Sequence, residues 1–258
     1  MQNDDFDNKG FLIAPNFIEG DYANLLRSDL IESIRMEAEA LSQLTIRTDN
    51  RFDKNMVHNA FLYSRNLMDV LNIEKLRKFT DLLLCKNAIV YAYQTSSAPP
   101  FQSNYGRRIH VDAPRFIHGY RTNLGFILAL DDFTIQNGGT ELLPGSHKTE
   151  LSPSENDFDQ KKVQITCNRG DAIFFDARLW HRTGQNQTDQ WRHALTINFC
   201  RPYMRSRFDF PRMLDVVLDD NFLDTQSAKY MGFDVRMPTS LSEFYLPEGK
   251  RLYKPGQE

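Results

Sequence analysis

Two histidines and one aspartate in this sequence could together hold a metal ion. His110 and Asp112 are two residues apart in the segment 107–112, which is expected to be extended. Residues i and i+2 of a strand point to the same face, so both side chains can reach one point. His181 ends an apolar run farther along the chain and would complete a set of two histidines and one carboxylate. This set is typical of non-haem Fe(II), because it leaves positions for a cosubstrate and dioxygen.

An arginine and a threonine follow these three residues at a useful spacing. Arg192 begins the strand expected after His181, so the intervening loop could return its guanidinium beside the metal. A 2-oxo acid that chelates iron needs its distant carboxylate held, and a bidentate arginine suits that task. Thr183 could donate its hydroxyl to the same carboxylate. The alternative is that Arg192 is a strand-edge arginine in a salt bridge. If Arg192 points inward, strand alternation points His193 away.

Short strands separated by turn signals predict the fold that positions these residues. They are expected at residues 88–94, 122–130, 140–143, 162–166, 172–175 and 194–199. Many short strands at this spacing indicate a sandwich or barrel. We therefore predict a mainly β protein with helices (α+β), built as a double-stranded β-helix, which is a jelly roll of the cupin type.

Helical patterns precede the strands. After a short strand within residues 10–17, apolar residues recur every four positions at Tyr22, Leu26, Leu30 and Ile34. A second helical segment is predicted through Leu67, Leu71, Leu76, Phe79 and Leu83. We expect one domain over residues 1–258. Its jelly-roll core would cover about 87–200, its N-terminal helical support 1–86 and its C-terminal extension 201–258, with a helix near 213–218.

Composition excludes several partners. With 31 basic and 34 acidic residues the net charge is -3, so neither nucleic acid nor an anionic membrane surface is an expected partner. The first residues are acidic and polar, unlike a signal peptide, and no apolar run reaches membrane-spanning length, so a cytoplasmic location is expected. The three cysteines have no CxxC spacing and predict neither a disulfide framework nor a zinc knuckle.

Four blocks in this order resemble the phytanoyl-CoA dioxygenase family of Fe(II)/2-oxoglutarate-dependent oxygenases. They are His110-x-Asp112, residues 137–148 (NGGTELLPGSHK), residues 170–186 around His181, and Arg192. The resemblance covers about residues 87–200, and the opening at 10–17 with its helix is also similar. One departure is a tryptophan that some relatives carry on the strand after the aspartate, which an aliphatic residue near Leu128 replaces here.

The resemblance implies Fe(II) as cofactor, with 2-oxoglutarate and O2 as cosubstrates. It implies His110, Asp112 and His181 as the catalytic iron ligands. Arg192 would anchor the C5 carboxylate of 2-oxoglutarate, with help from the hydroxyl of Thr183. Gln94 falls near a position that faces cosubstrate or substrate in some relatives, which makes it a third cofactor-binding candidate.

The expected activity is hydroxylation of an unactivated C–H bond, with release of succinate and CO2. Asp112 disfavours halogenation, because halogenating enzymes of this chemistry carry a small residue in place of that ligand. Desaturation, epimerisation and cyclisation use the same ligands and stay open, as do a non-catalytic jelly-roll binding protein and a hydrolytic zinc site. Arg107, Arg108, Arg115 and Arg121 surround the metal-binding pair. If Arg115 or Arg121 faces the pocket, the substrate is a small metabolite that carries a carboxylate or phosphate.

Overall fold

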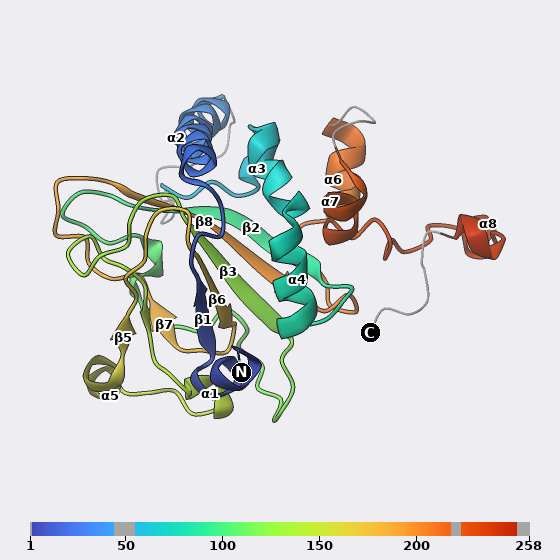
Figure 1. Ribbon diagram of the computed structural model, residues 1–258. Helices are drawn as coiled ribbons and strands as arrows, with labels where there is room; N and C mark the ends of the chain where they lie inside the picture. Colours follow the sequence, from blue (N-terminus) through green and yellow to red (C-terminus); the bar gives the residue numbers. More distant parts are fainter. Residues whose placement is uncertain (1, 44–54, 218–222, 252–258) are drawn as a thin grey trace.

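Two antiparallel β-sheets form the centre of the protein (Figure 1). A computed structural model describes residues 2–43, 55–217 and 223–251. The larger sheet has the strand order β1-β6-β3-β8-β2, and the smaller has the order β5-β4-β7. The strands are β1 (Phe11–Ala14), β2 (Ile89–Ala98), β3 (Asn123–Ala129), β4 (Glu141–Leu142), β5 (Val163–Gln164), β6 (Ala172–Asp176), β7 (His181–Arg182) and β8 (Arg192–Cys200). The predicted mixed α+β architecture with antiparallel sheets is confirmed.

Helices cover the face of the larger sheet that points away from the smaller sheet (Figure 1). The described helices are α1 (Gln2–Lys9), α2 (Gly20–Ser42), α3 (Arg65–Asp69), α4 (Glu74–Leu83), α5 (Glu155–Lys161), α6 (Phe210–Val217), α7 (Thr225–Tyr230) and α8 (Leu241–Phe244). Leu26 and Leu30 of α2 are fully buried and join Phe126 and Phe174 of the sheet in the main hydrophobic core. Burial of such side chains contributes about 1.5–3 kcal/mol each.

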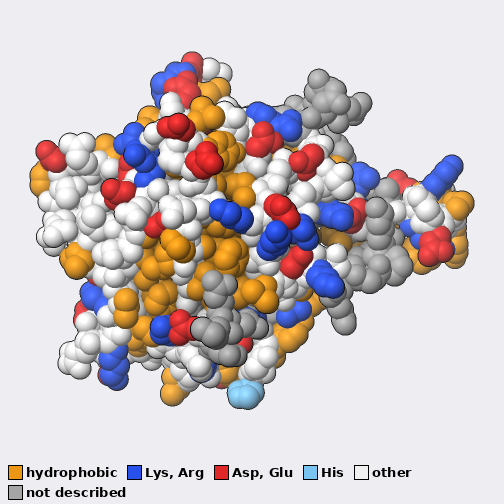
Figure 2. Space-filling model, viewed as in Figure 1, with side chains coloured by type: hydrophobic (Ala, Val, Ile, Leu, Met, Phe, Trp, Pro, Cys, Tyr) orange, Lys and Arg blue, Asp and Glu red, His pale blue; other side chains and the backbone are white. Residues whose placement is uncertain are grey.

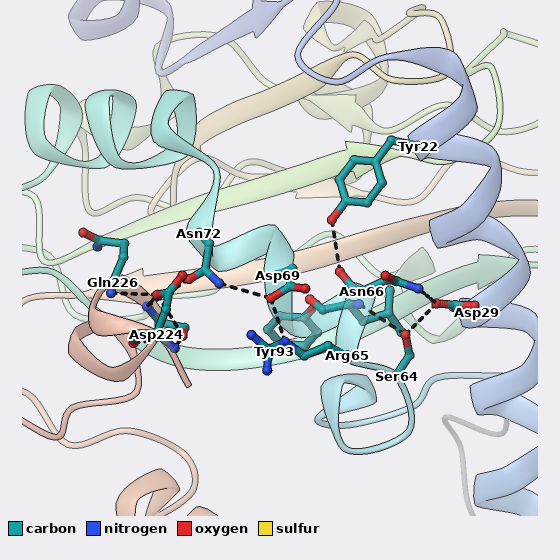
Figure 3. Close-up of polar contacts among 12 residues, drawn as sticks. Tyr22, Asp29, Ser64, Arg65, Asn66, Asp69, Asn72, Tyr93, Asp224 and Gln226 are labelled. Carbon is teal, nitrogen blue, oxygen red and sulfur yellow. Dashed lines mark hydrogen bonds and ion pairs between the residues drawn. The ribbon is translucent and has the colours of Figure 1, made fainter. Parts of the chain in front are cut away.

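Polar contacts fix the helices to one another above the sheet (Figure 3). Asp29 of α2 accepts hydrogen bonds from the Ser64 hydroxyl at 2.6 Å and the Asn66 amide at 2.8 Å, and Tyr22 donates to the Asn66 carbonyl at 3.2 Å. Farther along, the Asn72 amide donates to Asp69 at 3.2 Å. These bonds hold α2 against α3 and so give the larger sheet a fixed support.

A second hydrophobic cluster lies between the two sheets. It includes Ile127, Phe133 and Phe175, together with Leu142 of the smaller sheet. Alternate residues of a strand face opposite sides, so Leu128 joins the helical core while its neighbour Ile127 faces the space between the sheets. The aliphatic residue of this strand that faces the space between the sheets is therefore Ile127, the neighbour of Leu128.

The predicted elements mostly form, with shifted ends. The helical pattern through Leu67 and Leu83 is divided into α3, the 3-10 turn η2 (Val70–Asn72) and α4, because Ile73 is extended with φ -65° and ψ 118°. Strand β2 runs on to Ala98, past the serines expected to end it, because it pairs with β8 up to Arg192. The helix expected near 213–218 is α6, and its last expected residue lies outside the described part of the chain.

The C-terminal segment leaves the body of the protein after α7 and carries α8 at its tip (Figure 1). Leu241, Phe244 and Tyr245 of this segment are exposed, and Figure 2 shows hydrophobic, basic and acidic side chains mixed on it. Among the helices of the described residues, none has the length and hydropathy that a membrane crossing requires. The cysteines Cys85, Cys167 and Cys200 are free thiols, of which Cys167 is only partly buried.

Candidate metal centre and cosubstrate pocket

His110 and His181 are brought together by a single antiparallel bridge. The His110 N–H donates to the His181 carbonyl at 3.0 Å, and the reverse bond measures 2.9 Å. The N–H of Asp112 donates to the Ala177 carbonyl at 2.9 Å. The segment around His110 and Asp112 is thus an extended loop with one bridge residue, and the expected strand at this position does not form. Both side chains still face one point, as the i, i+2 spacing predicts.

The three side chains form a cluster with the dimensions of a metal site. Nε2 of His110 lies 3.6 Å from Oδ1 of Asp112, and Nε2 of His181 lies 3.8 Å from the same oxygen. One ligand atom from each of the three residues lies within 4.8 Å of the others. Within residues 2–43, 55–217 and 223–251 this is the one group of three or more His, Cys, Asp or Glu residues that could hold a metal ion. The sequence prediction that these residues meet is confirmed.

Backbone carbonyls orient both imidazoles. Nδ1 of His110 lies 2.7 Å from the Arg108 carbonyl, and Nδ1 of His181 lies 2.9 Å from the Leu179 carbonyl. A carbonyl oxygen only accepts, so each Nδ1 carries a proton and each Nε2 is the ring nitrogen that faces Asp112. Metal-binding histidines are oriented by such a bond on the other ring nitrogen.

Phe175 supports the second imidazole from the side. Its ring meets the His181 ring edge to face, with centroids 5.0 Å apart. This position is open only because residue 125 is glycine: a Cβ on Gly125 would lie 2.2 Å from the Phe175 ring. Gly125 therefore fixes the place of Phe175, and Phe175 limits the rotation of His181.

The protonation states of the cluster suit a cation. Burial would raise the pKa of Asp112, but the two imidazoles and the Asn198 amide outweigh it and lower that pKa to about 2. Burial and then the positive charge of His110 lower the pKa of His181 to about 4. The pKa of His110 is raised, since its bond to Asp112 and the charge of that carboxylate outweigh burial. At neutral pH the cluster holds a carboxylate and at least one neutral imidazole, which are the forms that bind metal.

A cavity opens from this cluster toward Arg192. Its walls include Ile127, Phe133, Thr140, Phe175 and Ala194 around the guanidinium. Arg192 is only 1% exposed, and its guanidinium carbon lies 4.3 Å from the centre of the Phe133 ring. Its Nε and Nη2 have no hydrogen-bond partner among the described residues. Burial lowers the pKa of Arg192 to about 10. A buried cation with unused donors that faces a cavity is a ready anchor for an anion.

Thr183 and Gln94 line the same cavity. The N–H of Thr183 donates to the Gly106 carbonyl at 2.8 Å, which places its hydroxyl beside Gly106. Gln94 lies on β2, opposite Thr196 of β8. His193 points to the other side, where its Nδ1 meets the Ser97 hydroxyl at 2.8 Å, as strand alternation predicted. All six predicted site residues therefore border one cavity.

The arginines near the metal-binding pair do not collect at this cavity. Arg121 binds Asp176 at 2.8 Å and Asp7 at 3.0 Å, and Arg115 is exposed outside the cavity wall. Arg107 and Arg108 border a separate surface groove with Trp180. Neither Arg115 nor Arg121 lines the pocket, so the condition for an anion site built from these two arginines is not met; acidic partners on α1 and β6 hold Arg121.

Sequence reasoning missed several cavity residues. Asn198 donates to Oδ2 of Asp112 at 3.4 Å, and Asn104 and Tyr105 complete another part of the wall. The alternation that begins at Arg192 could have found Thr196 and Asn198, since residues 192, 194, 196 and 198 share one face of β8. The loop residues gave no comparable signal.

Comparisons with known proteins agree with this geometry. Uncharacterized protein Rv1501 of Mycobacterium tuberculosis is 31% identical over 201 residues, which cover 76% of this chain and 73% of that protein. The solved structure of EvdMO1 matches with a TM-score of 0.61 at 22% identity over 78% of this chain, which spans about half (49%) of the EvdMO1 chain. The epimerase SnoN, solved in complex with Fe3+, alpha ketoglutarate and nogalamycin RO, matches with a TM-score of 0.57 at 17% identity over 77% of this chain and 81% of SnoN.

These structural matches show the jelly-roll fold of non-haem oxygenases, and the sequence itself places the chain more closely. The model of the phytanoyl-CoA dioxygenase (PhyH) family matches residues 6–194, which include the metal cluster and Arg192. The chain therefore belongs to the phytanoyl-CoA dioxygenase family.

Proposed function

We propose that this protein is an Fe(II)- and 2-oxoglutarate-dependent dioxygenase that hydroxylates an unactivated C–H bond of a small metabolite. The observation that carries the proposal is the pairing of two features in one cavity: the His110, Asp112 and His181 cluster, and the buried Arg192 with unused donors. A set of three metal-binding side chains alone would fit many reactions. A buried guanidinium at the other end of the cavity suits a cosubstrate that chelates metal at one end and carries a carboxylate at the other.

The residues present fit the cofactor that the family implies. Two imidazoles and one carboxylate on one side leave the remaining positions to ligands from solution, and this set favours Fe(II). Iron bound there would supply the activation of dioxygen that couples decarboxylation of 2-oxoglutarate to insertion of an oxygen atom into a C–H bond. We assign His110, Asp112 and His181 as the iron ligands.

The chain's own residues supply binding and orientation. Arg192 would take the C5 carboxylate of 2-oxoglutarate, and Thr183 would add its hydroxyl. Water would be excluded from the carbon backbone of 2-oxoglutarate by the apolar side chains of Ile127, Phe133 and Phe175. Strand β8 carries Arg192 at its start and Asn198 near its end, so one rigid element would set the distance between the carboxylate anchor and the metal. We further propose that the helices and both sheets work as one dioxygenase domain.

Two alternatives keep the same site with another outcome. SnoN is an epimerase of similar fold, so epimerisation, desaturation or cyclisation is the second candidate for this cavity. A hydrolytic zinc site or a non-catalytic binding protein would keep the ligands, yet neither gives the buried Arg192 a role. Asp112 is present, which favours oxygen insertion over halogenation.

The test is anaerobic addition of Fe(II) and then 2-oxoglutarate to the purified protein. The chelate gives a weak visible charge-transfer band, which we expect to appear only with both additions. Asp112→Ala should abolish the band and succinate formation with the fold intact, because the Asp112 side chain is 32% exposed and lies outside the hydrophobic core. A folded wild-type protein without the band would refute the proposal, and wild-type succinate formation by Asp112→Ala would refute the ligand assignment.

A further inference from the structure

The chain after β8 returns along the outer edge of the larger sheet, where His58 also forms a single bridge with Gln94. Strand β2 is the last strand in the order of that sheet. The N–H of Arg207 donates to the Tyr91 carbonyl at 2.9 Å, and the Ser206 hydroxyl donates to the Val90 carbonyl at 2.8 Å. The guanidinium of Arg207 also lies 5.6 Å from the centre of the Tyr91 ring. These contacts fix residues 206 and 207 beside β2, at the level where β2 borders the cavity.

Arg207 uses this position to hold a cavity residue. Its Nη1 donates to Oε1 of Gln94 at 3.2 Å. An amide has one acceptor end and one end with two donors, so the bond leaves Nε2 of Gln94 as the end that is free to meet a ligand. Within the described ranges, Nε2 of Gln94 has no acceptor, and Gln94 lines the cavity that contains the metal cluster.

Arg207, unlike Arg121 and Arg182, has no acidic partner among the described residues. Arg121 binds two aspartates, and Arg182 binds Glu141 at 2.6 Å and Asp159 at 2.6 Å. Across residues 55–217 and the two other described stretches, Arg207 makes no ion pair. Its charge therefore stays available near Gln94. The remaining wall on this side consists of uncharged residues, Met56, Ser96, Asn104 and Tyr105.

We propose that Arg207 is a positioning residue that turns the Gln94 amide into a dedicated donor, so that this side of the cavity selects substrates carrying a carboxylate or phosphate. The proposal rests on the proposed function and names the substrate class of that same site. Two donors beside an unpaired guanidinium favour an anionic oxygen over a neutral one, because charge-assisted hydrogen bonds are the stronger ones. The same chemistry could instead hold the C1 carboxylate of 2-oxoglutarate, and the experiment separates these two sources.

The probes are hexanoate, octanoate and decanoate, each matched with its primary amide. Binding to the anaerobic protein with Fe(II) and 2-oxoglutarate is followed by the change in the charge-transfer band, and turnover by succinate formation. The wild type should bind at least one acid about tenfold more tightly than its amide. Arg207→Gln should remove that preference, Arg207→Lys should restore part of it, and the affinity for 2-oxoglutarate should stay within about twofold.

Gln94→Glu is the variant that tests the donor role of Gln94 most directly. The new carboxylate would keep Arg207 in place through an ion pair but would remove both donors, so acid binding should fall while amide binding persists. Arg205→Gln is the matched control, because Arg205 is exposed in the same segment and does not line the cavity. It should leave both preferences unchanged.

Each other outcome overturns the inference. If the wild type binds acids and amides equally, or binds neither, the cavity is not selective for anions. Retained preference in Arg207→Gln rejects the role of Arg207. A loss of 2-oxoglutarate affinity in Arg207→Gln assigns the donors to the cosubstrate and rejects the substrate class. Failure of the proposed function is distinct, because the wild type would then give no charge-transfer band with Fe(II) and 2-oxoglutarate.

Discussion

The side chain of Asn198 donates to Asp112, with 3.4 Å between Nδ2 of the amide and Oδ2 of the carboxylate. Oδ1 of Asn198 in turn accepts from the Asn123 amide at 2.9 Å. Asn123 and Asn198 lie on the neighbouring strands β3 and β8, and both are buried. The pair fixes one oxygen of Asp112 to the rigid sheet and leaves the other oxygen facing the two imidazoles.

Asn198→Leu should weaken metal binding without unfolding the protein. Partners that orient a metal ligand are typically worth about 10–100-fold in affinity, and a fall of that size is expected for Co(II). The measurement is a titration of the metal-free protein with Co(II), followed by its visible absorption. Thr196→Val is the control on the same face of β8, since its hydroxyl donates to the Gln94 carbonyl rather than to Asp112. Equal Co(II) affinity in the wild type and in Asn198→Leu would show that Asp112 needs no such support.

Arg192→Met should have opposite effects on stability and on cosubstrate binding. The guanidinium is buried with two nitrogens unpaired, and a buried charge without full pairing destabilises the fold. An apolar side chain of similar length should therefore raise the free energy of unfolding of the ligand-free protein, by about 1–3 kcal/mol. The same change should remove the charge-assisted bonds to 2-oxoglutarate, which are worth about 1.5–3 kcal/mol each.

The two effects of Arg192→Met are measured separately. Urea unfolding of the ligand-free protein gives the stability, and the charge-transfer band gives the 2-oxoglutarate affinity. Arg27→Met serves as the comparison, since Arg27 is partly exposed, its Nε pairs with Asp131 at 2.6 Å, and it does not line the cavity. A less stable Arg192→Met protein with unchanged 2-oxoglutarate affinity would make Arg192 a structural residue.

The sequence predicted the parts of this site that depend on strand periodicity and on motif order. The meeting of His110, Asp112 and His181 followed from the spacing of two ligands and an apolar run before the third. The inward direction of Arg192 and the outward direction of His193 followed from alternation. The spacing of His110 and Asp112 and the alternation along β8 are local features, whereas the bridge that brings His181 to His110 joins distant segments and was expected only from the order of the motifs.

The parts that the sequence did not predict depend on contacts between distant segments. Nothing in the order of residues brings Arg207 back to Gln94, which is 113 positions away, because the return depends on how the chain after β8 packs along the outer edge of β2. The arginines near Asp112 seemed suited to an anion, yet Arg121 pairs with Asp7, 114 positions away. The apolar spacing predicted one continuous helix, but the extended residue Ile73 divides it. A single extended residue does not change the spacing of the apolar residues, so the sequence pattern cannot reveal it.

Gly125→Ala should disturb the metal site through Phe175. The new Cβ would lie 2.2 Å from the Phe175 ring, so the ring must move, and it can move only against the buried strands β3 and β6. Such overpacking costs about 1–3 kcal/mol of stability, and a displaced Phe175 no longer limits the rotation of His181. Thermal unfolding and the Co(II) titration should both register the change.

Gly20→Ala is the matched control for Gly125→Ala. A Cβ on Gly20 meets no atom within 4 Å, and Gly20 begins helix α2. Its replacement by alanine should leave Co(II) affinity unchanged and stability unchanged or slightly raised. A Gly125→Ala protein that behaves like Gly20→Ala would show that Phe175 has no part in holding His181.

His193 should make the metal-free protein less stable in acid. Burial lowers its pKa from 6.5 to about 4, although Asp131 opposes that shift, and its Nδ1 meets the Ser97 hydroxyl at 2.8 Å. Between these two values the unfolded chain binds a proton that the folded protein excludes, so the free energy of unfolding falls as the pH falls from 6.5 toward 4. One pKa unit corresponds to about 1.4 kcal/mol, which bounds the contribution of His193 at roughly 3 kcal/mol.

His181 shares the sign of this effect, because its pKa is also lowered to about 4, so the two histidines must be separated. His193→Gln retains a partner for Ser97 and cannot take up a proton. Urea unfolding of the wild type and of this variant at about pH 7 and about pH 4.5, with chelator present, should show a loss on acidification that is about 1–3 kcal/mol smaller in the variant. Equal losses would mean that His193 titrates alike in the folded and unfolded states, and that its burial beside Ser97 leaves it accessible to protons.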